Sequence, residues 1–281
     1  MFQEDLLAGK VIVVTGGGSG LGRSMAQRFA SLGATVVIAS RNQEKVAQAA
    51  AELIENTGGQ IHAESVNVRD EESVGQFCER VYQQFGSVYG LVNNAAGNFL
   101  APTEDISGKG FRAVVETVLH GTFYCTHAFG KRMIEQGGGA MLNIVTTYAW
   151  TGSAFVLPSA CAKAGVLAMT RSLAVEWATY GIRVNAIAPG PFPTEGAWAR
   201  LMPPGLDMEE MLQKKVPAGR VGSHEELANL ATYLMAEGSA YVTGEVVTID
   251  GGEWLMGGEF NGFTAMDRAQ LKAVFGAMRE G

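Results

Sequence analysis

The chain has 281 residues, of which 47% are hydrophobic and 17% are charged, and its formal net charge is −7. This is the profile of a folded globular protein, and the length suits one large α/β domain or two small ones. Acidic and basic residues are mixed along the chain, so the sequence predicts no basic face and no nucleic-acid partner.

Membrane segments, metal sites and disulfides are not expected either. The chain has no run of eighteen apolar residues, and the opening MFQEDLLAGKVIVV lacks a signal or transit pattern, which predicts a cytoplasmic protein without a membrane partner. Cys78, Cys125 and Cys161 form no C-x-x-C pair and fall in helix-like segments, where we expect buried thiols. The four histidines have no acidic partner motif, so no metal is predicted.

The first half of the chain alternates β-branched runs with amphipathic segments. Four runs predict strands: KVIVVTG (10–16), TVVIAS (35–40), IHAESVNV (61–68) and VYGLVNNA (88–95). Helices are expected between them, at 21–33, 43–57 and 71–85. Such alternation implies right-handed crossovers and a parallel sheet, with helices on both faces because most of the strands are strongly apolar.

The second half continues the alternation. A helical region is expected over 104–136 and a long helix from Pro158, and three further strands are expected at 140–147, 183–190 and 246–250. No linker or repeat interrupts the chain, so residues 1–281 are predicted to form a single doubly wound α/β domain. Its irregular segment 189–223 follows a strand's carboxyl end, where substrate loops occur, and residues 253–281 form a C-terminal extension.

A glycine-rich stretch, TGGGSGLG (15–22), directly follows the first strand and opens a helix. Glycines at such a turn allow backbone N–H groups to approach a pyrophosphate at the helix N-terminus. The stretch therefore predicts a dinucleotide site that includes Gly16, Gly18, Ser19, Gly20 and Leu21.

The end of the second predicted strand indicates which dinucleotide is bound. A cofactor without a 2′-phosphate is usually held there by an acidic residue. This chain has Ser40 and Arg41 instead, a hydroxyl and a guanidinium suited to a phosphate dianion. NADPH is therefore favoured over NADH.

The segment PSACAKAG (158–165) places Ser159 and Lys163 four residues apart, on one face of a helix. By itself this pair could be a nucleophile and its base in a hydrolase. The spacing is S-x-x-x-K, however, not the S-x-x-K of penicillin-binding enzymes, and a hydrolase would leave the dinucleotide signature unexplained.

TGGGSGLG, VNNAAG (92–97), the helical Lys163 and APGP (188–191) occur in this order, and together they resemble the short-chain dehydrogenase/reductase family over nearly the whole chain. The resemblance implies a Rossmann fold with a seven-stranded parallel sheet and a homotetramer. It implies that Lys163 binds the nicotinamide ribose. It also implies that further cofactor contacts come from Asn67, Asn94, Ala95, Pro189, Gly190, Pro191 and Phe192.

Asn67 stands where the family usually has an aspartate that contacts adenine, and three further positions depart from the family pattern. The tyrosine that usually precedes the lysine by four residues is Ser159 here, the usual helix asparagine is His120, and the usual site serine is Thr146. These departures resemble one branch, the NADPH-dependent 2,4-dienoyl-CoA reductases, particularly the mitochondrial type. The motifs that carry this resemblance are NNAAGNF (93–99), TTYAWTGSAF (146–155), PSACAKAG, GPFPTEGAWARL (190–201) and GEFN (258–261).

This second resemblance implies a reduction of 2,4-dienoyl-CoA thioesters to 3-enoyl-CoA in the β-oxidation of unsaturated fatty acids. The implied catalytic residues are Tyr148, Asn98, Lys163 and Ser159. The implied substrate contacts are Arg41, Arg69, Phe99, Ser107, Tyr148 and Arg200.

Two other readings stay open. One is a dinucleotide-binding scaffold without redox chemistry. The other is a reductase acting on another activated C=C bond or on a carbonyl, its specificity reshaped by His120, Trp150 and Trp198.

Overall fold

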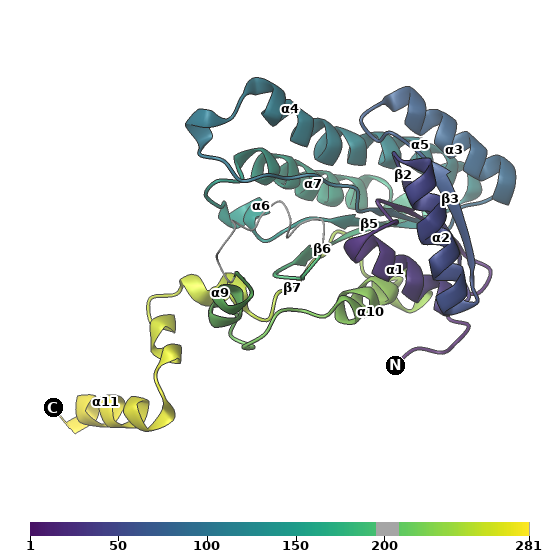
Figure 1. Cartoon of the computed structure of the whole chain (residues 1–281). Coiled ribbons are helices and arrows are strands. Elements are labelled where there is room, and N and C mark those ends of the chain that lie inside the picture. The colour runs from purple at the N-terminus through teal and green to yellow at the C-terminus, as the bar shows by residue number, and fades with distance from the viewer. Residues whose placement is uncertain (195–207, 281) are drawn as a thin grey trace.

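The computed structural model describes residues 1–194 and 208–280, and a single seven-stranded sheet dominates it (Figure 1). All neighbouring strands are parallel, in the order β3-β2-β1-β4-β5-β6-β7. The strands are β1 (Val11–Thr15), β2 (Thr35–Ser40), β3 (Gln60–Ser65), β4 (Gly90–Asn93), β5 (Gly139–Ile144), β6 (Ile182–Pro189) and β7 (Val246–Ile249). The predicted doubly wound α/β fold is confirmed, with the strand order reversing between β1 and β4, where such sheets bind ligands.

Helices cover both faces of the sheet. One apolar cluster joins the strands to α1, α2 and α10, and a second joins them to α3, α5 and α7. A π-helical turn, Glu116–His120, connects α4 to α5. The helices are α1 (Gly20–Ser31), α2 (Gln43–Thr57), α3 (Glu71–Phe85), α4 (Gly108–Val115), α5 (Gly121–Gln136), α6 (Tyr148–Thr151), α7 (Leu157–Glu176), α9 (Met208–Lys215), α10 (His224–Met235) and α11 (Arg268–Glu280).

The local sequence explains most of these boundaries. Asn42 caps α2 by accepting the Lys45 N–H at 2.9 Å, and Asp70 caps α3 by accepting the Glu72 N–H at 3.0 Å. The predicted bounds of β2 are confirmed, and α2 and α3 lie where the sequence approximately placed them. The prediction missed α10, although Ser223 and Glu226 form the capping box that signals a helix start.

Predictions of two kinds are partly wrong, namely the ends of some strands and the burial of one cysteine. The third predicted strand ends at Ser65 and not at residue 68, and the fourth spans Gly90–Asn93 and not 88–95. The fifth strand ends at Ile144, so Thr146 and Thr147 lie in the turn before α6 and not in the strand. Cys161 is exposed, whereas Cys78 and Cys125 are buried as expected. Helical spacing is the reason for the error at Cys161: α7 turns Ser159, Ala162 and Lys163 inward, which leaves Cys161 on the solvent side.

A buried chain of polar side chains ties the middle of the sheet to the helices. The amide of Asn93 on β4 donates to Thr126 on α5 and to Asn143 on β5, both at 2.9 Å. The amide of Asn143 donates in turn to Thr170 on α7, also at 2.9 Å. Because buried polar groups are costly unless paired, this chain specifies how α5 and α7 sit on β4 and β5.

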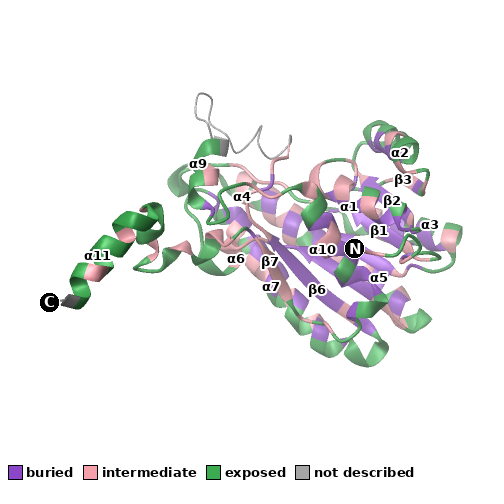
Figure 2. Cartoon of the chain, turned by 90° about the horizontal axis from the view of Figure 1, so that it is seen from below, coloured by how far each residue is buried: buried purple, intermediate pink, exposed green. Residues whose placement is uncertain are grey.

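The C-terminal segment extends away from the sheet and ends in α11, which is mostly exposed (Figures 1 and 2). No helix within residues 1–194 and 208–280 is long and apolar enough to cross a membrane. The same residues contain no group of three or more His, Cys, Asp or Glu side chains placed to hold a metal ion.

Candidate active site

The glycine-rich stretch forms a tight loop between β1 and α1. Gly16 and Gly20 have φ values of +66° and +53°, which disfavour residues with a side chain. Gly22 is needed for a different reason, since a Cβ there would lie 2.4 Å from Asn94 Nδ2 and 2.5 Å from the Gly16 carbonyl oxygen. The loop can therefore keep its shape only with glycine at these positions.

The N-terminus of α1 is suited to an anion. Ser19 is its N-cap, but the Ser19 side chain makes no capping hydrogen bond, and the first turn contains no acidic residue. Helices α2 and α3, in contrast, have both a side-chain cap and glutamates in their first turns. The open N–H groups of α1, together with the glycine loop, fit the pyrophosphate of a dinucleotide.

Ser40 and Arg41 lie at the carboxyl end of β2, on the same edge of the sheet as the glycine loop. Arg41 is exposed and forms no ion pair with any described carboxylate. Its guanidinium is thus available to an external phosphate, as the sequence predicted for the 2′-phosphate of NADPH.

The other predicted cofactor residues lie along the same edge, with different roles for their side chains. Asn94 donates from Nδ2 to the Thr15 and Gly16 carbonyl oxygens, at 3.0 and 3.3 Å, so it braces the glycine loop. Asn67 follows β3, and its Oδ1 accepts the Arg69 N–H at 3.3 Å. After β6, the Gly190 N–H donates to the Ile249 carbonyl oxygen of β7 at 2.9 Å. Phe192, two residues further on, is buried.

Tyr148, Ser159 and Lys163 are brought together by α6 and α7. The Tyr148 hydroxyl lies 3.0 Å from the Ser159 Oγ, and Ser159 is buried. The Lys163 ammonium is also buried and donates a hydrogen bond to the Ile144 carbonyl oxygen at the end of β5. Ser159 thus pairs with a phenol and Lys163 with the backbone, which is not the arrangement of a Ser–Lys hydrolase.

Burial changes the acid–base properties of Lys163. Loss of hydration disfavours the ammonium form and lowers the pKa of Lys163 to about 8. This side chain can therefore change its charge within the pH range in which enzymes are commonly assayed.

The loop that carries Asn98 is joined to the loop that follows the Tyr148 turn. The backbone N–H of Ala101, in the loop after β4, donates to the Phe155 carbonyl oxygen, in the loop after β5, at 3.0 Å. Phe155 has a φ of +66°, a strained value for a residue with a side chain. Asn98 Oδ1 accepts the Phe99 N–H at 2.9 Å, which leaves the amide N–H groups of Asn98 available to a ligand.

A cavity of about 480 Å³ opens beside Asn98. Five predicted residues contribute to its wall: Arg41, Arg69, Asn98, Phe99 and Ser107. Lys109 lines it as well and was missed from the sequence, although it follows Ser107 by only two residues in the first turn of α4. The predicted contact Arg200 lies outside the described residues.

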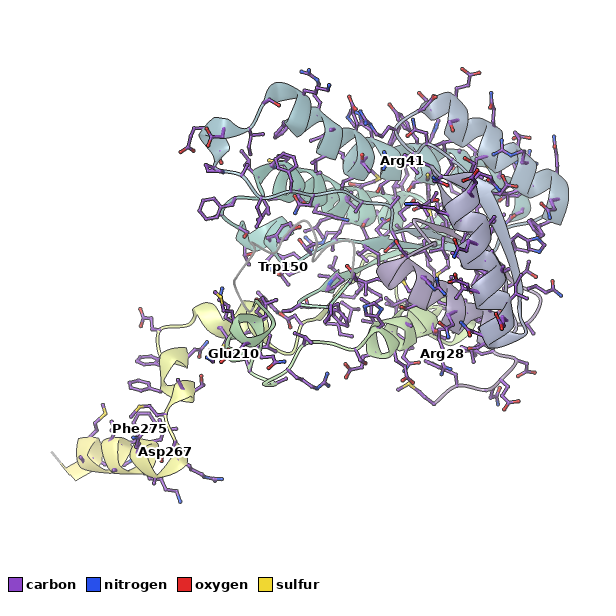
Figure 3. All side chains as sticks on the ribbon, viewed as in Figure 1. Arg28, Arg41, Trp150, Glu210, Asp267 and Phe275 are labelled. Carbon is purple, nitrogen blue, oxygen red and sulfur yellow. The ribbon has the colours of Figure 1, made fainter. Side chains whose placement is uncertain are left out.

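The residues suggested to modify specificity, and the departure at Thr146, differ in their exposure and in their contacts. Trp150 lies on α6, the turn that carries Tyr148 (Figure 3). Its ring packs edge-on against Trp254 of the C-terminal segment, with ring centroids 5.8 Å apart. Thr146 Oγ1 is buried without a hydrogen-bond partner in the described structure, so this hydroxyl is available to a bound ligand. His120 is exposed at the end of the π-helical turn, and Trp198 lies outside the described residues.

Fold and site together define a dinucleotide-binding oxidoreductase. Residues 16–253 match the family model described as "Enoyl-(Acyl carrier protein) reductase". A crystal structure of a short chain dehydrogenase from Bacillus anthracis is 47% identical and superposes with a TM-score of 0.78, covering 87% of this chain and 96% of the other. The chain belongs to the short-chain dehydrogenase/reductase family.

Two curated relatives are similar over most of the chain. A probable 2,4-dienoyl-CoA reductase of Caenorhabditis elegans, described as (3E)-enoyl-CoA-producing, is 42% identical and covers 90% of this chain and 83% of its own length. A probable 2,4-dienoyl-CoA reductase of Bacillus subtilis, described as (2E)-enoyl-CoA-producing, is also 42% identical and covers 88% and 97%.

The glycine loop provides a first test of the cofactor site. Gly22→Ala should weaken NADPH binding by about 5- to 100-fold, because the added methyl group overlaps Asn94 and the Gly16 carbonyl and displaces the loop. The comparison is Gly75→Ala on α3, where an added Cβ meets nothing within 4 Å. Titration of NADPH fluorescence checks both variants, and equal affinity in the two would contradict this account.

A second test uses the pKa of Lys163. We expect kcat/KM for NADPH to fall as the pH rises through about 8, because the free enzyme then loses the Lys163 positive charge. Initial rates and NADPH binding measured from about pH 6 to pH 10 report this titration. In Lys163→Met, NADPH binding should be weaker and should lack this step, so a step that persists in the variant would assign the titration to another group.

Proposed function

We propose that the protein catalyses the NADPH-dependent reduction of 2,4-dienoyl-CoA thioesters to 3-enoyl-CoA. The observation that carries this proposal is the hydroxyl pair at 3.0 Å between Tyr148 and Ser159. A serine occupies the family's tyrosine position on α7, and a phenol from the preceding turn reaches that serine. The relatives named as 2,4-dienoyl-CoA reductases support the same reaction class.

NADPH, when bound, supplies a hydride to the far end of the conjugated diene. The glycine loop and the N-terminus of α1 hold the pyrophosphate, while Ser40 and Arg41 bind the 2′-phosphate. Lys163 binds the nicotinamide ribose, and its fixed contact with the Ile144 carbonyl oxygen orients the ammonium group.

The reduction moves negative charge onto the thioester oxygen, so the chain must place hydrogen-bond donors there. The Tyr148 hydroxyl and the Asn98 amide are these donors, and Ser159 orients the phenol. A proton from water completes the reduction at carbon, so that one hydride and one proton are added in total. An enolate needs stabilisation more than it needs an acid, which explains why a phenol at position 159 is dispensable.

Arg41, Arg69, Phe99 and Ser107 are proposed to contact the CoA part of the substrate, because all four line the cavity beside Asn98. A homotetramer also belongs to this proposal and rests on the family resemblance; light scattering of the purified protein tests it. The cytoplasmic location stays a prediction.

A comparison of three substrates tests the function. NADPH oxidation with a 2,4-dienoyl-CoA should exceed that with a 2-enoyl-CoA and with a simple ketone, and chromatography of the product should yield the 3-enoyl isomer. A preference for the ketone would overturn the proposal. A 2-enoyl product would keep the reaction class and correct the position of the remaining double bond.

The role of Tyr148 is tested by removing one oxygen atom. Tyr148→Phe should lower kcat by about 10²- to 10³-fold, because a donor to the developing oxyanion is lost while the ring is kept. Tyr180→Phe, at an exposed position after α7, serves as the control and should retain the wild-type rate. Steady-state rates at saturating NADPH distinguish the two, and near-normal turnover by Tyr148→Phe would exclude the proposed role.

A further inference from the structure

Three cations line the cavity beside Asn98, and they differ in their availability to an anion. Arg69 forms an ion pair with Glu116 of the π-helical turn, with Arg69 Nε lying 3.1 Å from Oε2. Arg41 and Lys109 pair with no carboxylate in the part of the chain that the structure describes. Glu116 thus neutralises one of the three positive charges.

The two reactants compete for these cations. NADPH brings a 2′-phosphate to Ser40 and Arg41 at the end of β2. A CoA thioester brings a pyrophosphate and a 3′-phosphate, and the chain, with a net charge of −7, offers no general attraction for them. With Arg41 shared with the cofactor phosphate and Arg69 paired with Glu116, Lys109 is the cation of the cavity wall that neither of these anions engages.

We propose that Lys109 is the principal cation for the phosphates of the CoA part of the substrate, and that Arg69, which Glu116 partly neutralises, makes the weaker contact. Lys109 is exposed in the first turn of α4, a turn ordered by Ser107, whose Oγ accepts the Gly110 N–H at 3.1 Å. Its ammonium gives up no ion pair when it meets a phosphate, whereas Arg69 would have to leave Glu116. This inference rests on the proposed function, because it requires a CoA thioester as substrate.

The test compares two thioesters of the same dienoyl acid. One carries CoA, and the other carries pantetheine, which lacks the pyrophosphate and the 3′-phosphate. Lys109→Gln should lower the ratio of kcat/KM for the CoA substrate to that for the pantetheine substrate by about 3- to 20-fold, mainly through KM. The control is Lys272→Gln, which removes the same charge on α11, away from the sheet, and should keep the wild-type ratio (Figure 1).

Glu116 allows a second, independent test. Glu116→Gln frees Arg69, so it should improve kcat/KM for the CoA substrate more in the Lys109→Gln background than in the wild type. Suppose instead that Glu116→Gln raises kcat/KM equally in the wild type and in Lys109→Gln. Glu116 would then act only by its negative charge near the cavity, and the different roles assigned to Arg69 and Lys109 would be overturned. An unchanged substrate ratio in Lys109→Gln would overturn the inference directly.

Binding of free CoA separates this inference from the proposed function. Calorimetric titration of the NADP⁺-loaded protein should show weaker CoA binding for Lys109→Gln than for Lys272→Gln. Suppose that Lys109→Gln weakens CoA binding relative to Lys272→Gln, but that the wild type reduces no dienoyl thioester. The proposed reaction is then wrong, and the Lys109 site is retained. If the wild type reduces the dienoyl thioester and Lys109→Gln binds CoA as the control does, the Lys109 site fails alone.

Discussion

The attachment of α7 to β5 is the constraint on which the rest of the site depends. Two buried hydrogen bonds make it: Lys163 to the Ile144 carbonyl oxygen, and Asn143 to Thr170. They lie about two helical turns apart along α7, so together they set both the height and the rotation of the helix on the sheet. Ser159, one turn before Lys163, is thereby fixed opposite the turn that carries Tyr148.

This attachment also determines which side chain the Tyr148 phenol meets. Tyr148 belongs to α6, a helix of a single turn, which by itself has little stability. The Tyr148 hydroxyl lies 3.0 Å from Ser159 Oγ, and neighbouring residues of the same segment make two further contacts. Trp150 of the same turn packs on Trp254, and the loop that follows is joined to the Asn98 loop through Ala101 and Phe155. These contacts give a one-turn helix a defined position on the rest of the domain.

Electrostatics divides the site into two parts. Around Lys163 the surroundings are buried, and the cost of removing an ammonium from water lowers its pKa. The cavity beside Asn98 lies at the surface, where three cations and one carboxylate are half-exposed or exposed. The first part suits precise orientation of a cofactor, and the second suits reversible binding of a highly charged substrate.

The family resemblance implied most of the proposed site residues, whereas the sequence by itself determined the sheet, the starts of several helices and the glycine loop. These follow from local rules: β-branched runs form strands, Asn42 and Asp70 begin helices, and positive φ at Gly16 and Gly20 excludes side chains. Only the tertiary structure decided which side chains meet. The pairing of Glu116 with Arg69 joins residues 47 positions apart, and the contact of Trp150 with Trp254 joins the ends of β5 and β7. Such contacts depend on how helices pack on the sheet, which no local pattern specifies, and they determine which cations of the cavity wall already have a carboxylate partner.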